Sequence, residues 1–274
     1  MTGNKSRGSI SVFFPAYNDA EAIAPLVSEA LTVLPMLTDD FEVIVVNDGS
    51  TDATANVLDE LARSVPHVKI IHHGKNKGYG GALRSGFNSA SKELIFYTDG
   101  DGQYNVRELL TLHALLTPGV DVVNGYKIKR ADGASRGLAG SIYNRLAHVL
   151  FSIPIRDVDC DFRLLRTSAM GQVNLVSSSG AICVELIHKL HRAGCTFVEA
   201  PVHHYPRLFG RSQFFKPSRV ARMASGLVSL WLRLVVLPNL IPESWSSRWA
   251  GAKRTTKEQK RLGPNHSEQQ AVNK

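Results

Sequence analysis

The segment FEVIVVNDGSTDATANVLDELARS, residues 41–64, decides the fold class. Residues 41–46 are rich in β-branched side chains, which is typical of a buried strand. A polar run, Asn47 to Asp52, then turns the chain, and apolar residues from Thr51 to Ser64 recur at helical spacing. Ser50 is the expected N-cap of this helix. A strand, a polar loop and a helix in this order predict an α/β unit.

The same alternation continues on both sides of this unit. We expect further strands at residues 10–14, 68–71, 94–97, 120–123 and 196–200. We expect further helices at residues 21–34, 79–90, 106–116, 141–151 and 181–193, with Asn105 and Glu108 forming a capping box for the third. The pattern predicts a Rossmann-like α/β fold, a mainly parallel sheet flanked by helices. Ligands of such sheets bind beyond the carboxyl ends of the strands.

The overall composition is that of an ordinary globular protein. Of the 274 residues 43% are hydrophobic and 20% are charged, which excludes a wholly disordered, collagenous or coiled-coil chain. The three cysteines, Cys160, Cys183 and Cys195, have no C-x-x-C spacing, so they support neither a disulfide framework nor a structural zinc site. Residues 1–8 are followed by no apolar signal segment. These features favour a protein of the reducing cytosol.

The positive charge is concentrated in the last part of the chain. The formal net charge is +8, and residues 246–274 hold seven Lys or Arg against two acids. We expect a flexible N-terminus over residues 1–8, a catalytic domain over 9–216, an amphipathic helix over 217–241 and a disordered basic tail over 242–274. Because no nucleic-acid motif accompanies the tail, a nucleic-acid partner is not expected.

Two carboxylates follow the strand expected at residues 94–97. Asp99 and Asp101 are two residues apart and so point the same way in an extended segment, and Gly100 lets a ligand come close. Gln103 would join the same face. Oxygen ligands at a strand end suit Mg²⁺ or Mn²⁺, which bridge carboxylates to substrate phosphates. The alternative is a simple turn, because D-G-D-G is also good turn chemistry.

Two other loops have less specific patterns. Asp48 ends the strand at residues 41–46, where an acid can accept hydrogen bonds from a ribose or base, or can merely turn the chain. The glycine-rich loop at residues 76–81 leads into a helix and so offers N–H groups to a phosphate. It is not a P-loop, and no G-x-G-x-x-G follows the first strand, which counts against a nucleotide hydrolase or a hydride-transfer enzyme.

Taken together, these motifs resemble the family 2 glycosyltransferases with the GT-A fold. The motifs are P-A-Y-N-D at 15–19, V-N-D-G-S-T-D at 46–52, N-K-G-Y-G-G-A-L-R-S-G at 76–86 and D-G-D-G-Q at 99–103. Residues 159–164 resemble the D-x-x-F-R-L segment, and residues 203–212 resemble the R-x-x-G-x-S loop of the dolichol-phosphate mannose synthase branch. The resemblance runs from about Ser9 to about Leu237.

The resemblance implies roles for individual residues. It places the nucleotide at Pro15, Ala16, Tyr17, Asn18, Asp19, Asp48 and Gly78, and the metal, Mg²⁺ or Mn²⁺, at Asp99, Asp101 and Gln103. Arg207 falls where the branch has a phosphate-binding arginine. Asp19 stands where Glu is usual, and Gln213 stands where the branch has Lys, so Arg211 or Lys216 would have to supply that contact.

The resemblance also implies an activity. It predicts inverting transfer of a sugar from a GDP- or UDP-linked donor to a polyprenyl phosphate, dolichyl or undecaprenyl, at the cytoplasmic membrane face. A phosphate acceptor is already anionic and needs cations rather than a base. The candidate phosphate and acceptor contacts are His203, His204, Arg207, Arg211, Ser212 and Lys216, and the candidate catalytic residues are Asp99, Asp101, Asp161 and Arg163.

Other activities remain open at this point. A soluble transferase acting on a hydroxyl acceptor would need a base, for which Asp159, Asp161 and Glu185 are candidates, and Arg163 then pairs with one of them structurally. A catalytically silent nucleotide-sugar-binding protein is a second alternative. A sugar nucleotidyltransferase is a more distant one, because its glycine-rich basic N-terminal signature is missing.

A membrane contact is expected from the helix after residue 216. Small or polar residues recur along one face, and the remainder is apolar. The small or polar positions are Arg219, Arg222, Gly226, Ser229 and Arg233. Because Arg233 and Pro238 interrupt the apolar run, we expect a monotopic helix lying in the bilayer interface rather than a spanning one. The alternatives are packing on the domain's own core or a dimer interface, and the oligomeric state stays open.

Overall fold

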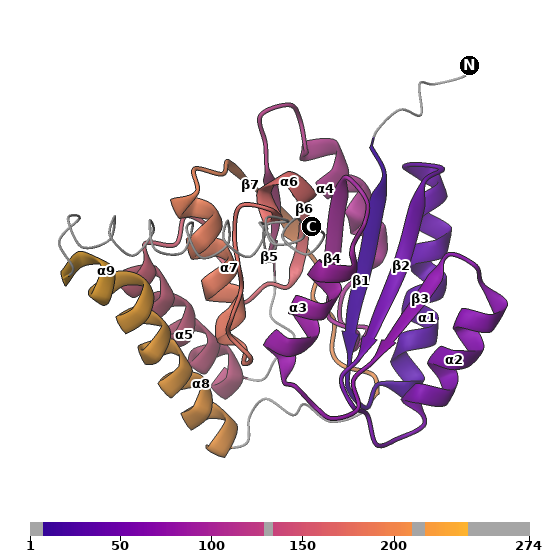
Figure 1. The fold of residues 1–274 in the computed structure, drawn as a ribbon, viewed down its shortest axis with the longest axis horizontal. Helices are drawn as coiled ribbons and strands as arrows, with labels where there is room; N and C mark the ends of the chain where they lie inside the picture. Colours follow the sequence, from indigo (N-terminus) through magenta and orange to yellow (C-terminus); the bar gives the residue numbers. More distant parts are fainter. Residues whose placement is uncertain (1–7, 129–133, 210–216, 241–274) are drawn as a thin grey trace, which may run out of the picture. The chain divides into compact units, whose positions relative to one another are not determined.

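A computed structural model describes residues 8–128, 134–209 and 217–240, with the side chains of 134–139 and 217–223 left out of the description (Figure 1). The chain divides into two compact units, one ending at Leu230 and the other beginning at Trp231. The first unit contains the sheet and all helices through residue 230. The predicted helix of residues 217–241 is therefore divided between the two units.

The elements alternate along the chain as the sequence predicts. The strands are β1 (Ile10–Ala16), β2 (Phe41–Asn47), β3 (Val68–His72), β4 (Leu94–Thr98), β5 (Val122–Lys127), β6 (Phe162–Arg166) and β7 (Phe197–Val202). The α-helices are α1 (Ala20–Val33), α2 (Thr54–Ser64), α3 (Tyr79–Ser89), α4 (Leu109–Leu115), α5 (Ala134–Phe151), α6 (Thr167–Met170), α7 (Ala181–Arg192), α8 (Pro217–Trp231) and α9 (Leu237–Leu240). The 3₁₀ turns η1 (Leu34–Met36) and η2 (Val106–Glu108) and the π-helical turn η3 (Leu232–Val236) complete the described elements.

The strands form one seven-stranded sheet in the order β3-β2-β1-β4-β6-β5-β7. All neighbouring pairs are parallel except those of β6, which runs antiparallel to both β4 and β5. The prediction of a mainly parallel α/β sheet is confirmed. Strand β6 was not predicted, because Arg163 and Arg166 interrupt its apolar pattern.

The core has two layers because helices cover both faces of the sheet (Figure 1). Successive residues of β1 serve opposite faces, as expected for a strand. Phe14 packs in the layer that includes Ile23 of α1 and Leu109 of α4. Phe13 packs in the layer of α3 and α7, and its ring stacks on Tyr97 at a centroid distance of 5.2 Å.

Two predicted helix starts differ from the observed ones. Ser50 does not cap α2, which begins at Thr54, because Asp52 Oδ1 accepts the Thr54 N–H at 3.0 Å and Ser50 Oγ accepts the Asn18 N–H. Asn105 does cap η2 by accepting the Arg107 N–H. The expected second half of the capping box is wrong, because the carboxylate of Glu108 binds His203 instead.

Helix α8 packs in part on its own domain. Leu227 and Leu230, both expected on the lipid-facing side, are 4% and 1% exposed. A side-chain carbon at Gly226 would lie 3.2 Å from Ser179 Oγ, so this supposedly polar face also meets the domain. Val228 remains 53% exposed. Among the described helices none combines the length and the apolar character that crossing a bilayer requires.

Candidate functional site

The candidate site residues lie along one edge of the sheet. The carboxyl ends of β2, β1 and β4 carry Asp48, residues 15–19 and Asp99 respectively. Because β6 is antiparallel to β4, its beginning lies at the same edge, with Phe162 paired to Thr98. Asp161, just before β6, is therefore brought to the edge that Asp99 occupies, and this placement follows only from the unpredicted strand.

Asp48 is buried at the end of β2. Its Oδ1 lies 2.6 Å from His73 Nδ1 and accepts the Lys77 N–H at 2.8 Å. The other ring nitrogen of His73 lies 2.8 Å from Ser85 Oγ. His73 was not among the predicted site residues, since a histidine just after a strand has no pattern of its own. The contacts fix Asp48 between β2 and the loop that precedes α3.

The loop of residues 15–19 is held by polar contacts to the loop after β2. Asn18 has a left-handed backbone with φ 58°, and its Oδ1 accepts the Thr51 N–H at 2.8 Å. The Asp19 carboxylate accepts the Tyr17 N–H at 2.9 Å. Burial raises the pKa of Asp19 to about 6, and this effect outweighs the opposing effects of the Tyr17 amide and of Arg207.

Asp99 and Asp101 stand at the end of β4 with different partners. Asp99 accepts a hydrogen bond from Tyr79 Oη at 2.7 Å. Burial raises the pKa of Asp99 well above its usual range, and the nearby Asp161 and Asp101 raise it further. Asp101 accepts the Gln103 N–H at 3.1 Å and is bound by the guanidinium of Arg207. The contact of Tyr79 with Asp99 was not predicted.

Gly100 serves the protein backbone rather than a ligand. Its N–H donates to the Pro15 carbonyl at 3.2 Å, and a side-chain carbon at this position would collide with that carbonyl oxygen. The expectation that Gly100 admits a ligand is thus corrected. The residue allows the loops after β1 and β4 to touch.

Gly78 and its neighbours are packed rather than open. Gly78 has φ 81°, and a side-chain carbon there would collide with the Ser178 carbonyl oxygen. The N–H groups of Lys77, Gly78 and Gly80 donate to Asp48, Asn76 and Ser178 respectively. These N–H groups of the glycine-rich loop are therefore not free to bind an anion. This corrects the prediction that residues 76–81 offer N–H groups to a phosphate.

The loop after β7 brings Arg207 to the carboxylates. Arg207 binds Asp101 and lies 3.9 Å from Asp19 Oδ1, and its Nε is buried without a hydrogen-bond partner among the described residues. Gln103 holds this loop, since its Nε2 donates to the Tyr205 carbonyl at 2.8 Å. The Gln103 amide nitrogen thus makes a loop contact, and a metal contact through the Gln103 amide oxygen stays a prediction.

The other predicted phosphate contacts are less central or lie outside the described residues. His203 is paired with Glu108 on an exposed face. His204 forms an isolated bridge with Tyr104 and packs edge-on against its ring. Arg211, Ser212 and Lys216 lie outside the described residues.

Asp161 and Arg163 form the centre of a buried polar network. Arg163 is fully buried, and its guanidinium donates to Asp161 Oδ1 at 2.8 Å and to the Val158 carbonyl at 2.5 Å, as well as to Tyr97 Oη and Asn124 Oδ1. Cys183 Sγ lies 3.2 Å from Asp161 Oδ1. Arg163 is therefore a positioning residue that holds Asp161.

The two remaining candidate bases differ in their surroundings. Glu185 is fully buried and accepts the Ser177 N–H at 2.8 Å and a Lys189 hydrogen bond at 2.6 Å. The Lys189 ammonium and the Ser177 N–H and hydroxyl lower the pKa of Glu185 despite its burial. Buried and ion-paired in this way, Glu185 is poorly suited to be the base. Asp159 has a side chain that is 40% exposed and lies 3.6 Å from the Lys127 ammonium.

The carboxylates at the end of β4 fit a divalent cation. Within the described ranges no cluster of three or more His, Cys, Asp or Glu forms a complete metal site. Two carboxylates suffice for Mg²⁺ or Mn²⁺ when substrate phosphates supply further ligands. Burial and, to a smaller extent, the nearby Asp161 and Asp101 raise the pKa of Asp99, and a bound cation would offset both effects. The guanidinium on Asp101 is a positive charge already present at this site.

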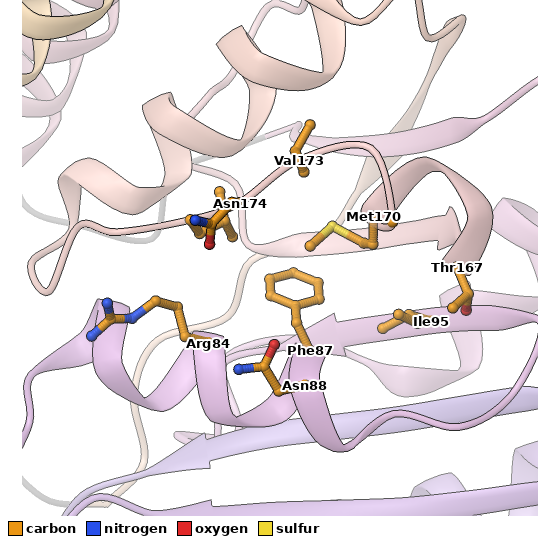
Figure 2. A pocket seen from close by; sticks show the side chains of 10 residues that line it. Arg84, Phe87, Asn88, Ile95, Thr167, Met170, Val173 and Asn174 are labelled. Atoms are coloured by element: carbon orange, nitrogen blue, oxygen red, sulfur yellow. The ribbon is translucent and has the colours of Figure 1, made fainter. Parts of the chain in front are cut away.

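A hollow of about 250 Å³ lies elsewhere in the first unit (Figure 2). It is lined by Arg84, Phe87 and Asn88 of α3 and by Met170, Val173 and Asn174 near α6. None of the predicted site residues lines it. The site at the sheet edge is thus distinct from this hollow.

Comparison with protein families gives a match to the description Glycosyl transferase family 2 over residues 11–173. The undecaprenyl-phosphate 4-deoxy-4-formamido-L-arabinose transferase of Enterobacter sp. (strain 638) is 28% identical over 215 residues, covering 78% of this chain and 65% of that protein. The chain thus spans just under two thirds of the length of this relative.

Two solved structures share the fold. The glucosyl-3-phosphoglycerate synthase from Mycobacterium tuberculosis, in complex with Mn²⁺, UDP and phosphoglyceric acid, has a TM-score of 0.64 at 16% identity, covering 84% of this chain and 79% of that one. The mannosyltransferase PcManGT from Pyrobaculum calidifontis, in complex with GDP-Man and Mn²⁺, has a TM-score of 0.59 at 21% identity, covering 84% and 66%. These likenesses confirm the predicted GT-A fold.

Proposed function

The chain belongs to glycosyl transferase family 2, and on this premise we propose that it transfers a sugar from a nucleoside diphosphate sugar to a polyprenyl phosphate. The donor is GDP- or UDP-linked, and the anomeric carbon is inverted by direct displacement. The acceptor carries a dolichyl or undecaprenyl chain. The reaction takes place at the cytoplasmic face of the membrane, with the protein bound peripherally.

One observation carries the donor half of the proposal. Arg207, from the loop after β7, reaches the carboxylates of both Asp101 and Asp19 across the ends of β1 and β4. A guanidinium with a buried, unpartnered Nε at that point is suited to a diphosphate, which it can bind in a bidentate manner. Asp48 then lies on the nucleoside side of this point and Asp161 on the sugar side, following the strand order.

In the proposed reaction, different residues of this chain bind the metal, the diphosphate and the nucleoside. Asp99 and Asp101 would hold Mg²⁺ or Mn²⁺, which supplies positive charge to the departing diphosphate. Arg207 adds a second cation to the same leaving group. Asp19 and Asp48 hold the loops that meet the nucleoside. Tyr79 donates a 2.7 Å hydrogen bond to Asp99 and so holds its carboxylate in a fixed orientation before the donor binds.

Two findings support a lipid phosphate acceptor. The Enterobacter relative is named as a transferase to undecaprenyl phosphate. The sequence of the loop after β7 also holds Arg211 and Lys216, cations of the kind that an anionic acceptor needs in place of a base. Contact with the membrane surface through residues 217–241 is part of the proposal, and the exposed Val228 would belong to that contact.

A hydroxyl acceptor remains a second candidate because of Asp159. Its carboxylate lies near the Lys127 ammonium and is still partly exposed, whereas Asp161 and Glu185 are buried. A hydroxyl acceptor would need such a base to take its proton. The two candidates therefore predict different sensitivities to the loss of Asp159, whereas the loss of Arg207, which binds the donor diphosphate, should impair both.

The test is a transfer assay with purified full-length protein, Mn²⁺ or Mg²⁺, a panel of GDP- and UDP-sugars, and undecaprenyl or dolichyl phosphate against a hydroxyl acceptor. Arg207→Gln should abolish transfer to either kind of acceptor, because Arg207 binds the donor diphosphate. For a lipid phosphate acceptor, Asp159→Asn should be tolerated. Arg156→Gln, which alters an exposed arginine paired with Glu199, is the matched control. Transfer only to the hydroxyl acceptor, with loss in Asp159→Asn, would overturn the lipid half of the proposal.

A further inference from the structure

The hydroxyl of Tyr143, on α5, has no hydrogen-bond partner among the described residues although it is buried. Leaving a buried polar atom unpaired forfeits its hydration without a hydrogen bond in return. Thr98 Oγ1 is also unpaired, but Thr98 is completely enclosed. Tyr143 as a residue is partly exposed although its hydroxyl oxygen is not, so a small shift of the side chain would bring that oxygen to a bound molecule. The unsatisfied hydroxyl is thus placed where a ligand can supply its partner.

Helix α5 is fastened to the segment that leads into the site. Asn144 Nδ2 donates to the Arg156 carbonyl at 2.5 Å, and Asn144 Oδ1 accepts the Val158 N–H at 3.1 Å. One turn further on, His148 Nε2 lies 2.6 Å from the Ile155 carbonyl oxygen. These contacts hold Tyr143 beside residues 155–158, immediately before Asp159 and Asp161.

The charge around Tyr143 restricts what it can bind. Burial raises the pKa of the Tyr143 phenol well above its usual value, and Cys183, Asp159 and Asp161 are close enough to raise it further. The phenol is therefore a neutral donor beside carboxylates. Asp161 and Asp159 are paired with Arg163 and Lys127, so these surroundings offer a phosphate no excess positive charge, whereas a sugar hydroxyl can accept from the phenol and donate to a carboxylate.

From this geometry we propose that the Tyr143 hydroxyl donates a hydrogen bond to a hydroxyl of the transferred sugar and so contributes to the choice of sugar. The inference rests on the proposed function and names the sugar end of that same site. Asp161 directly precedes Phe162, which pairs with Thr98 at the end of β4, and α5 is fastened to residues 155–158 just before it. The proposed contact therefore falls beyond the diphosphate and not at the nucleoside.

The test compares Tyr143→Phe with the unaltered chain and with the control Tyr126→Phe. Tyr126 lies on β5, and its ring packs against the Arg156 guanidinium. Calorimetric titrations in the presence of Mn²⁺ measure affinity for a nucleoside diphosphate and for the corresponding nucleotide sugar. Tyr143→Phe should bind the nucleoside diphosphate equally well and the nucleotide sugar about 3- to 10-fold more weakly, the value of one neutral hydrogen bond. Tyr126→Phe should change neither affinity.

Two further readouts separate a sugar contact from a structural role. Without ligand, Tyr143→Phe should unfold at the same temperature as the unaltered chain or a higher one, since the hydroxyl it removes has no partner. The ratio of kcat/KM for the preferred donor sugar to that for its epimers should fall, which a purely structural hydroxyl would not change.

Several results would overturn the inference. Equal binding of the nucleotide sugar by Tyr143→Phe would remove the contact, and so would equal weakening of both ligands or a lowered unfolding temperature. A raised KM for the acceptor alone would assign the hydroxyl to the acceptor instead. If the unaltered chain binds neither ligand, the proposed function fails and this inference fails with it.

Discussion

Replacing Arg163 with methionine tests the buried network beneath the site. The side chain is fully buried and donates to four groups, namely Asn124 Oδ1, Tyr97 Oη, Asp161 Oδ1 and the Val158 carbonyl. Removing it leaves the Asp161 carboxylate buried without its countercharge. Breaking a buried ion pair in this way costs about 3–5 kcal/mol. For a domain of this size that lowers the unfolding temperature by on the order of 10 °C.

Arg166→Met is the matched control on the same strand. Arg166 is partly exposed, and its guanidinium donates to the Val120 carbonyl at 2.9 Å and the Thr117 carbonyl at 3.2 Å, which are neutral acceptors. The expected loss is about 1 kcal/mol, since no charge is stranded. Urea unfolding followed by circular dichroism measures both variants.

The double variant Arg163→Met with Asp161→Asn completes the test. Removing the stranded charge should recover part of the loss, so the two changes are not additive. If Arg163→Met costs no more than Arg166→Met, the ion pair is not what holds Asp161. The same conclusion would follow if the double variant were less stable than the sum of its two single changes.

Three further predictions concern single residues of the first unit. Burial alone would raise the pKa of Glu42, but hydrogen bonds from Lys69, Ser11 and Ser91 lower it to about 2. The ionised Glu42 therefore stabilises the fold above its unfolded pKa of 4.5. Glu42→Gln should cost about 3 kcal/mol at pH 7 and progressively less as the pH falls toward 2. Burial raises the pKa of Asp19 to about 6, so its ionisation lowers the stability of the fold as the pH rises from 4 through 6. Asp19→Asn should therefore be more stable than the unaltered chain by up to about 3 kcal/mol at pH 7 and equally stable at pH 3. Unfolding curves at several pH values check both, and a pH-independent difference would contradict either. Gly100→Ala should cost about 1–3 kcal/mol and weaken nucleotide binding, because the new carbon collides with the Pro15 carbonyl oxygen; unchanged unfolding and binding would show that the two loops move apart freely.

The parallel half of the fold and the loops of the site were predictable because each strand carries a local signal. Apolar runs end at polar loops in residues 10–19, 41–52 and 94–103, and parallel strands bring those loops to one edge. No comparable signal marks β6. Its central arginine is buried only because an acid two residues earlier and a tyrosine from β4 surround it. Such a strand is apparent only in three dimensions.

The partners of the site residues were also hidden from the sequence. Asp48 meets His73 across a separation of 25 residues, and Arg207 meets Asp101 across 106. The glycines were predicted to make room for a ligand, whereas the structure shows a different role. Gly78 and Gly100 allow backbone segments to touch, and a one-dimensional motif does not distinguish that role from contact with a ligand.

Calorimetric titration of GDP and UDP into the full chain, with and without Mn²⁺, tests the central claim most directly. The account predicts that Mn²⁺ tightens the binding of one of these nucleotides at least about tenfold, equivalent to about 1.4 kcal/mol. It also predicts that Asp99→Asn and Asp101→Asn each lose this gain while remaining folded. Binding that is indifferent to Mn²⁺ and unchanged in both variants would contradict the assignment of these two carboxylates to the metal and the diphosphate.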